Sequence, residues 1–275
     1  MLRKGDLTQG GIITTLLQFT LPMLAGSLLQ QCYNIADTLI VGQCIGANAL
    51  AAVGSAYTLM VFLISILLGL SMGSGTVFSL QYGAGDLSAL RRSIYVSLLL
   101  IGTVTILLNV AVFLWLDPIL RWLQVPYDIY SLMRNYLWII FWGIVFTFLY
   151  NFYAALLRAV GDSVTPLWFL AVSVVLNIGL DLFLILVLDQ GIEGAAVATV
   201  IAQGTAASGI LLYTYKTRPE LRLHREDMCF DRSSLREITS FSTLTCVQQS
   251  VMNFGILMVQ GLVNSFGTVV MAAFA

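Results

Sequence analysis

The sequence predicts an all-α fold, a polytopic membrane helical bundle made of a six-helix amino-terminal lobe and the start of a second, pseudo-symmetric lobe. Of the 275 residues, 59% are hydrophobic and only 10% are charged, whereas soluble domains carry about 25% charged residues. Mean hydropathy is +0.90. The charged residues also divide the chain into apolar runs of about the 20 residues that a bilayer requires.

Each apolar run predicts one membrane helix, and the runs follow one another with short polar connections. Six of them precede the longest polar segment, and a seventh follows it before the start of an eighth. The predicted helices lie near Ile12–Val41, Ala49–Tyr82, Ser93–Leu116, Ser131–Leu157, Pro166–Leu188, Gly194–Tyr215 and Ile238–Val263, with an eighth from about Thr268.

The distribution of lysine and arginine predicts a cytoplasmic amino terminus, because basic residues gather in the cytoplasmic segments of membrane proteins. With that orientation only Arg121 and Arg134 face outward. We therefore expect a multi-pass protein of a prokaryotic plasma (inner) membrane whose first helix is its own insertion signal. The inner segments hold Arg3, Lys4, Arg91, Arg92, Arg158, Lys216, Arg218, Arg222, Arg225, Arg232 and Arg236.

The polar segment divides the chain into residues 1–215, the six-helix lobe, residues 216–236, a cytoplasmic linker, and residues 237–275, the start of the second lobe. Two short blocks recur after six intervening helices, an even number, which predicts parallel repeats related about an axis along the membrane normal. The chain is expected to be a fragment of a longer protein. The matching blocks are Leu29–Gln31 with Val247–Gln249, and Ile45–Val53 with Phe266–Phe274.

Several residue patterns exclude other classes of protein. The single histidine, His224, and four cysteines without a CxxC spacing argue against a metal or nucleophilic active site, so we expect no enzyme activity and no cofactor. A net charge of −1 argues against a nucleic-acid partner. The expected surroundings are the lipid bilayer, a small-molecule substrate and, for the second lobe, a separate chain.

The first helix carries the strongest functional signal. It is an apolar run that contains Pro22 and Asp37, and a carboxylate at bilayer depth costs roughly 2.5–3.5 kcal/mol. Tyr33 precedes Asp37 by one turn, as Asn177 precedes Asp181 in the fifth helix. Counting residues along the sixth helix places Thr199 at a similar depth to Asp37 and Asp181, in the outer half of the membrane. Hard oxygen ligands of this kind suit either a small cation or a proton, and the alternative is that both aspartates only hydrogen-bond to neighbouring helices.

A series of short motifs carries a family resemblance, and it runs in a fixed order through the first half of the chain. The motifs resemble those of the multidrug and toxic compound extrusion (MATE) transporters, most closely their DinF-like prokaryotic branch. The likeness covers essentially the whole chain. The matching residues are Pro22, Leu29-Gln30-Gln31-x-Tyr33-Asn34-x-x-Asp37, Leu50-Ala51-Ala52-Val53-Gly54, Gly83-Ala84-Gly85-Asp86 and Leu157-Arg158-Ala159-x-Gly161-Asp162-x-x-Thr165-Pro166.

The resemblance implies two six-helix lobes around a V-shaped cavity and an antiporter that exchanges Na+ or H+ for cationic or amphipathic compounds by alternating access. It also implies that Pro22 lies where the first helix bends when the pocket is protonated. A sodium ion would bind at Asp37, Asp181, Asn177 and Thr199. The coupling pocket carried over from the family consists of Tyr33, Asp37, Asn151, Asn177, Asp181 and Thr199.

Two alternatives stay open at this point. A lipid-linked sugar flippase of the same superfamily would need a cationic cavity, and the membrane runs contain almost no lysine or arginine. A truncated lobe that does not transport is the other alternative. Without a second lobe supplied by another polypeptide, we expect no transport by the chain alone, and vectorial efflux from proteoliposomes containing only this chain would contradict that expectation.

Overall fold

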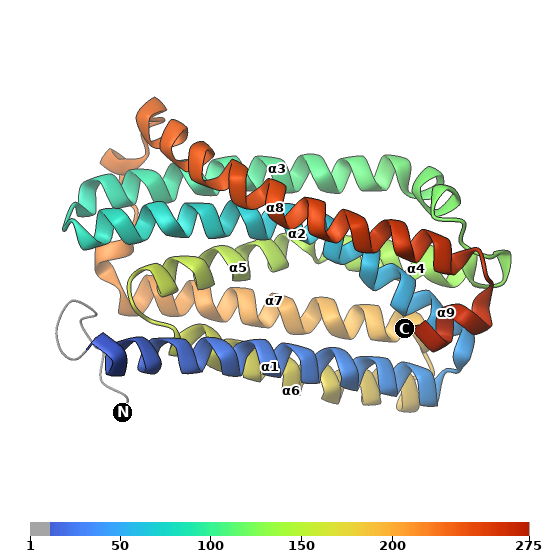
Figure 1. Ribbon diagram of the computed structural model, residues 1–275. Helices are drawn as coiled ribbons and strands as arrows, with labels where there is room; N and C mark the ends of the chain where they lie inside the picture. Colours follow the sequence, from blue (N-terminus) through green and yellow to red (C-terminus); the bar gives the residue numbers. More distant parts are fainter. Residues whose placement is uncertain (1–11, 275) are drawn as a thin grey trace.

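The structure is a computed structural model that describes residues 12–274, and this range is helical with no strand. Arg3 and Lys4, two of the predicted inner basic residues, lie outside it. Figure 1 shows the long helices running roughly side by side. The α-helices are α1 (Ile12–Cys44), α2 (Ala47–Gly83), α3 (Leu87–Trp122), α4 (Tyr127–Trp142), α5 (Ile144–Ala159), α6 (Val164–Leu182), α7 (Gly191–Thr217), α8 (Arg232–Asn264) and α9 (Thr268–Phe274).

Several helices are longer than the sequence predicts, because they continue past the apolar run to a polar cap. Helix α3 begins at Leu87, where the Asp86 side chain accepts a hydrogen bond from the Ala89 N–H at 2.9 Å. Helix α8 begins at Arg232, and the side chain of Asp231 before it accepts hydrogen bonds from the backbone N–H groups of Ser233 and Ser234. Hydropathy detects only the part of a helix that suits hydrocarbon, whereas a side-chain cap sets its first residue.

The prediction of one helix over Ser131–Leu157 is wrong. The chain forms α4 and α5 instead, with a bend of 48° between them at Gly143. A Cβ at Gly143 would lie 2.8 Å from Val200 Cγ2, so glycine is what allows the bend to pack against α7. Because both halves are equally apolar, hydropathy gives no sign of the break.

Helix α1, by contrast, runs as one continuous helix through Pro22. The irregular backbone is in α3 at Trp115 (φ −115°, ψ 17°), three residues before Pro118. That is the position expected from a proline ring that clashes with the preceding turn. The predicted helix to Leu188 ends earlier, since α6 gives way to a π-helical turn, η1 (Phe183–Val187).

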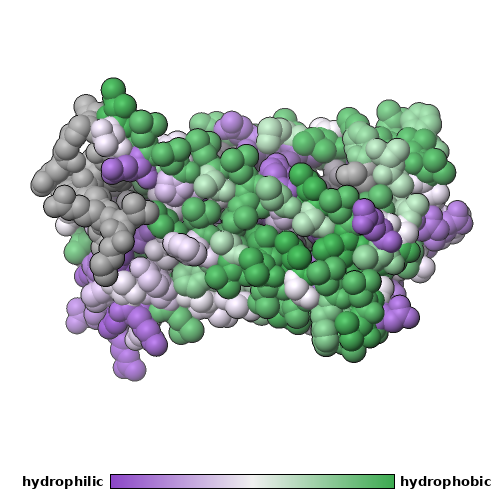
Figure 2. Space-filling model, turned by 90° about the horizontal axis from the view of Figure 1, so that it is seen from below, coloured by the Kyte–Doolittle hydropathy of each residue, from purple (hydrophilic) through white to green (hydrophobic). Residues whose placement is uncertain are grey.

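The surface of the bundle fits a membrane. Helices α2, α3, α6, α7 and α8 are each long and apolar enough to span a bilayer, and the bent α4–α5 pair makes a sixth span. Figure 2 shows a mostly hydrophobic face, with hydrophilic side chains gathered mainly toward the two ends. A polytopic all-α membrane bundle is therefore confirmed for the described residues.

Helix α2 lies at the centre of the packing and contacts α3, α4, α5, α8 and α9. Figure 1 shows α8 lying along α2, and α1 beside α6. Phe78 of α2 meets Phe152 of α5 edge to face, with ring centroids 6.0 Å apart, and both side chains are fully buried. The core between α2, α4 and α5 thus fixes α5, one of the four helices that carry the polar residues described below.

Residues 218–231 fold back against one end of the bundle, and ion pairs hold them there. Arg218 lies 3.2 Å from Asp162, which precedes α6, and Arg91 of α3 lies 2.8 Å from Asp227. We refer to this as the linker end. The opposite end, where α1 meets α2 at Ile45–Gly46, is referred to as the far end.

Candidate functional site

Two buried carboxylates face each other toward the far end of the bundle. Asp37 of α1 is 9% exposed and Asp181 of α6 is 0% exposed, and their side chains lie close enough to interact. Among the described residues, Oδ1 of each has no hydrogen-bond partner. Buried charge without a partner is costly, so this pair is suited to hold a shared proton or a small cation.

The helix register explains why the supporting groups lie beside this pair. Tyr33 and Asn177 each precede an aspartate by four residues and therefore share its helix face. The Tyr33 hydroxyl is 3.4 Å from Thr199 Oγ1 and joins α1 to α7. With its amide nitrogen turned toward the carboxylate, Asn177 donates to Asp181 Oδ2 at 2.9 Å and its oxygen accepts from the Thr199 N–H at 3.3 Å.

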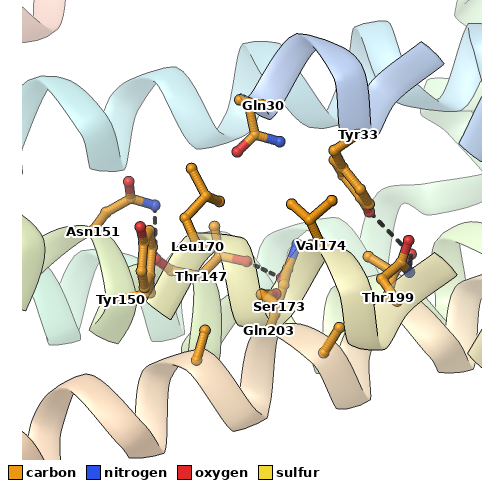
Figure 3. Close-up of a pocket in the computed structure, with 13 residues that line it drawn as sticks. Gln30, Tyr33, Thr147, Tyr150, Asn151, Leu170, Ser173, Val174, Thr199 and Gln203 are labelled. Carbon is orange, nitrogen blue, oxygen red and sulfur yellow. Dashed lines mark hydrogen bonds between the residues drawn. The ribbon is translucent and has the colours of Figure 1, made fainter. Parts of the chain in front are cut away.

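A cavity of about 110 Å³ adjoins these groups between α1, α5, α6 and α7 (Figure 3). This is room for several water molecules. Tyr33, Asn177 and Thr199 line it, but neither carboxylate does, so these three side chains separate the aspartates from the cavity. The other lining residues are Gln30, Thr147, Tyr150, Asn151, Leu170, Ser173, Val174, Ala202, Gln203 and Ala206.

Asn151 and Pro22 lie further from the carboxylates. Asn151 lines the cavity, and its side-chain nitrogen donates to the Thr147 carbonyl at 2.8 Å. No hydrogen bond joins it to either aspartate among the described residues. Pro22 lies about four turns before Asp37 along α1. Of the predicted site residues, five meet at the carboxylates, one lines the neighbouring cavity and one lies outside both.

The predicted set of site residues did not include the polar residues on the other side of the cavity, although Gln30 belongs to the family motif in the first helix. Figure 3 shows Gln30 reaching in from α1, and Thr147 of α5 hydrogen-bonded to Gln203 of α7. Each of the missed residues lies three or four positions from a predicted one, hence on the same helix face. That spacing was the available signal. The four pairs are Gln30 with Tyr33, Thr147 with Asn151, Ser173 with Asn177, and Thr199 with Gln203.

The side chains at the site offer oxygen atoms as ligands. The carboxylates, the Asn177 amide and the Thr199 hydroxyl are hard ligands of the kind that small cations prefer. Within residues 12–274, no three histidine, cysteine, aspartate or glutamate side chains gather into a transition-metal site. None of the residues that line the cavity is charged.

The comparisons with known proteins all indicate the same family. The MatE family model matches residues 22–183. A probable multidrug resistance protein, YpnP of Bacillus subtilis, is 34% identical over 269 residues, which cover 98% of this chain and 60% of YpnP. The multidrug export protein MepA of Staphylococcus aureus is 27% identical over 271 residues, covering 96% of this chain and 58% of MepA. The chain thus spans about 60% of the length of these relatives.

Solved structures show the same fold. The Vibrio cholerae MATE transporter VcmN in its bent form superposes with a TM-score of 0.81 at 26% identity, covering 95% of this chain and 59% of VcmN. Inward-facing and outward-facing structures of a multidrug resistance MATE family transporter both give a TM-score of 0.83 at 23% identity. They cover 89% and 92% of this chain, and 56% and 55% of theirs. Likeness of fold alone therefore does not favour one of these two conformations.

Proposed function

The chain belongs to the MatE family, and on that premise we propose that it forms the first lobe of a secondary antiporter that exports cationic or amphipathic compounds in exchange for Na+ or H+. The relatives named above are multidrug resistance and export proteins. The observation that carries the proposal is the buried pair of Asp37 and Asp181, each with an unpartnered oxygen. No covalent chemistry is involved.

The driving ion binds at this pair. Two carboxylates held close together repel one another when both are ionised, so a proton shared between them or a cation lying between them relieves the repulsion. For sodium, oxygens of Asp37, Asp181, Asn177 and Thr199 form the proposed ligand set. Tyr33 completes the pocket through its bond to Thr199.

Binding of the ion is coupled to the position of α1. Asp37 and Tyr33 belong to α1, whereas Asp181, Asn177 and Thr199 belong to α6 and α7. An ion that joins the two aspartates therefore holds α1 against α6 and α7, and its release favours another position of α1. Pro22 weakens the hydrogen-bond ladder of α1 nearer the linker end. That proline is the proposed point of bending during alternating access.

The uncharged cavity receives part of the exported compound. Its walls combine apolar side chains with amide and hydroxyl groups such as Gln30, Gln203 and Thr147, a mixture that suits amphipathic molecules. The absence of lysine and arginine from its lining disfavours a flippase for lipid-linked pyrophosphates, which needs cationic groups. The second wall of the transport pathway belongs to the second lobe.

Efflux of a fluorescent cationic dye tests this proposal in cells that lack their own multidrug pumps. The protein used is one in which the chain is continued by a second six-helix lobe. Asp37→Asn and Asp181→Asn should each abolish efflux, while Asp128→Asn, an exposed aspartate at the start of α4, should leave it unchanged. Imposed sodium and proton gradients then identify the driving ion. Efflux that persists in both variants at equal expression contradicts the proposal.

A further inference from the structure

Helix α8, the first helix after the linker, packs along almost the full membrane depth of α2. Contacts extend from Gly73 of α2, which meets Ser242, to Ser55, which meets Asn264. These positions are separated by about 27 Å along α2, close to the roughly 30 Å thickness of hydrocarbon. The two helices are antiparallel. Figure 1 shows α8 on the opposite side of the bundle from α1 and α6.

At the far end the contact is a buried hydrogen-bond network, here termed the far-end network. Ser55 Oγ donates to Asn264 Oδ1 at 3.0 Å, and Thr58 Oγ1 donates to Gln260 Oε1 at 3.2 Å. Gln260 Nε2 lies 2.9 Å from both Ser55 Oγ and Asn264 Oδ1. Asn264 Nδ2 donates to the Leu123 carbonyl at 2.8 Å, which ties the network to the end of α3. Asn264 is 1% and Gln260 3% exposed.

Toward the linker end the contact is of another kind, here termed the glycine crossing. A Cβ built on Gly69 would lie 2.4 Å from Cys246 Cα, and one on Gly73 would lie 2.3 Å from Ser242 Cα. Backbone therefore meets backbone, as at small-residue helix crossings in membranes. A hydrogen bond from Ser242 Oγ to the Leu70 carbonyl, 3.2 Å long, joins the two helices there. An apolar cluster of Val77, Val96 and Ile238 continues it.

The two halves of the contact respond differently to separation. When the far-end network opens, water replaces its hydrogen bonds, and such an exchange changes the free energy by only about 0.5–1.5 kcal/mol for each bond. At the glycine crossing, separation loses the close packing of backbone on backbone. Backbone contact at Gly69 and Gly73 can thus persist while the hydrogen bonds of the far-end network exchange with water.

We propose that the far-end network is a latch that closes the bundle between α2 and α8, and that the glycine crossing is the pivot about which α8 swings when the latch opens. This inference rests on the proposed function, because a swing of α8 relative to the first six helices is a movement that transport would use. It adds the place where the bundle opens and the residues that hold it closed. The latch residues are Ser55, Thr58, Gln260 and Asn264.

Labelling of single cysteines with a water-soluble maleimide tests the latch in the whole chain, in detergent or lipid, without drug or ion gradient. One reporter is Leu257→Cys, beside the network, and the other is Ile238→Cys, beside the pivot; both positions are buried and lie on α8. The latch is broken by Gln260→Ala with Asn264→Ala. The background replaces the native cysteines, Cys32, Cys44, Cys229 and Cys246, with serine.

The latch predicts labelling of Leu257→Cys at least tenfold faster in the latch variant, with no change at Ile238→Cys. The matched control is Asn253→Ala, which removes an equally buried amide that bonds only within α8, to the Gln249 carbonyl at 2.8 Å; it should not change either rate. Thr58→Val removes one bond at constant volume and should give a smaller rise.

Two results would overturn the inference. Equal acceleration at both reporters means that α8 detaches or unfolds as a whole, and no acceleration at either means that the network does not hold the far end closed. Because the reporters are read without ions or drug and leave Asp37 and Asp181 intact, failure here does not touch the proposed coupling site. Loss of the coupling site likewise would not alter the labelling rates.

Discussion

Replacing Gly73 by alanine should force α8 away from α2. The new Cβ would lie 2.3 Å from Ser242 Cα and 2.6 Å from Ser242 N and Oγ, whereas carbon atoms in contact are normally about 3.5–4.0 Å apart. The helices must therefore separate by more than about 1 Å. Because two of the three atoms are backbone, a change of side-chain rotamer cannot relieve the overlap.

The magnitude follows from two opposing effects. Overpacking of this kind costs about 1–3 kcal/mol, and the separation also weakens the bond from Ser242 to the Leu70 carbonyl. Replacing glycine by alanine within a helix stabilises the helix by up to about 1 kcal/mol, which partly offsets this cost. A net loss of about 1–2 kcal/mol remains. For a chain of this size each kcal/mol corresponds to roughly 2–4 °C in the melting temperature.

Thermal unfolding in detergent, followed by circular dichroism, measures this loss. Gly255→Ala is the matched control, because Gly255 also lies within α8 but a Cβ there meets nothing within 4 Å. It should be neutral or stabilising, by up to about 1 kcal/mol. The two variants are thus expected to shift the melting temperature in opposite directions. A Gly73→Ala chain as stable as the Gly255→Ala chain would refute the close crossing of α2 and α8.

Two further predictions concern the ion pairs at the linker end. Burial acts to raise the pKa of Asp227, but hydrogen bonds from the His224 backbone and from Arg91 outweigh it and hold the pKa below its ordinary value. A lowered carboxyl pKa stabilises the folded state above the unfolded value of about 3.9, so Asp227→Asn should lower the melting temperature at neutral pH. That difference should shrink as the pH falls below about 4 and be lost once the pH passes the lowered pKa of Asp227 in the folded state; a difference that does not shrink below pH 4 would argue against the pairing. Asp162→Ala removes the partner of Arg218, 3.2 Å away and mostly buried, and should cost about 1.5–3 kcal/mol by the same thermal assay; a change below about 0.5 kcal/mol would show that this pair does not hold the linker.

Much of the fold could be predicted because membrane helices must satisfy their own backbone and need apolar side chains over a known length. The break at Gly143 could not, since it lies between two equally apolar segments and depends on contact with Val200 of α7. Helix ends were predicted short for a related reason. Caps such as Asp86 and Asp231 lie in polar sequence, which hydropathy excludes.

The carboxylate site could be predicted from the depth of its residues within the membrane helices. Asp37, Asp181 and Thr199 count to the same end of three helices, and the structure brings all three helices together there. Gln203 and Thr147 were missed because a lone amide or hydroxyl in an apolar helix is common. Gln203 lies one turn from Thr199, and Thr147 lies one turn from Asn151. This spacing indicates a shared polar face only when several helices show it.

The far-end network was beyond sequence reasoning for a different reason. Ser55 and Thr58 lie in α2, and their partners Gln260 and Asn264 lie about 200 residues later in α8. Ser55 and Thr58 are three residues apart in α2, and Gln260 and Asn264 are four apart in α8, so each two share a helix face. This spacing does not reveal which other helix that face contacts. Only the antiparallel packing of α8 on α2 joins them.

The most direct test of the account is ion binding by the purified chain, followed through its thermal stability. A ligand that binds only the folded state stabilises it, by about 2.7 kcal/mol at one hundred times its dissociation constant. Sodium is titrated at fixed pH, and the pH is lowered at fixed ionic strength without sodium. The account predicts that one of these two treatments raises the melting temperature of the wild type. It predicts that Asp37→Asn and Asp181→Asn each abolish that rise, and that Asp128→Asn keeps it. A rise that survives in both variants, or the absence of any rise in the wild type, would contradict the claim that these aspartates bind the driving ion.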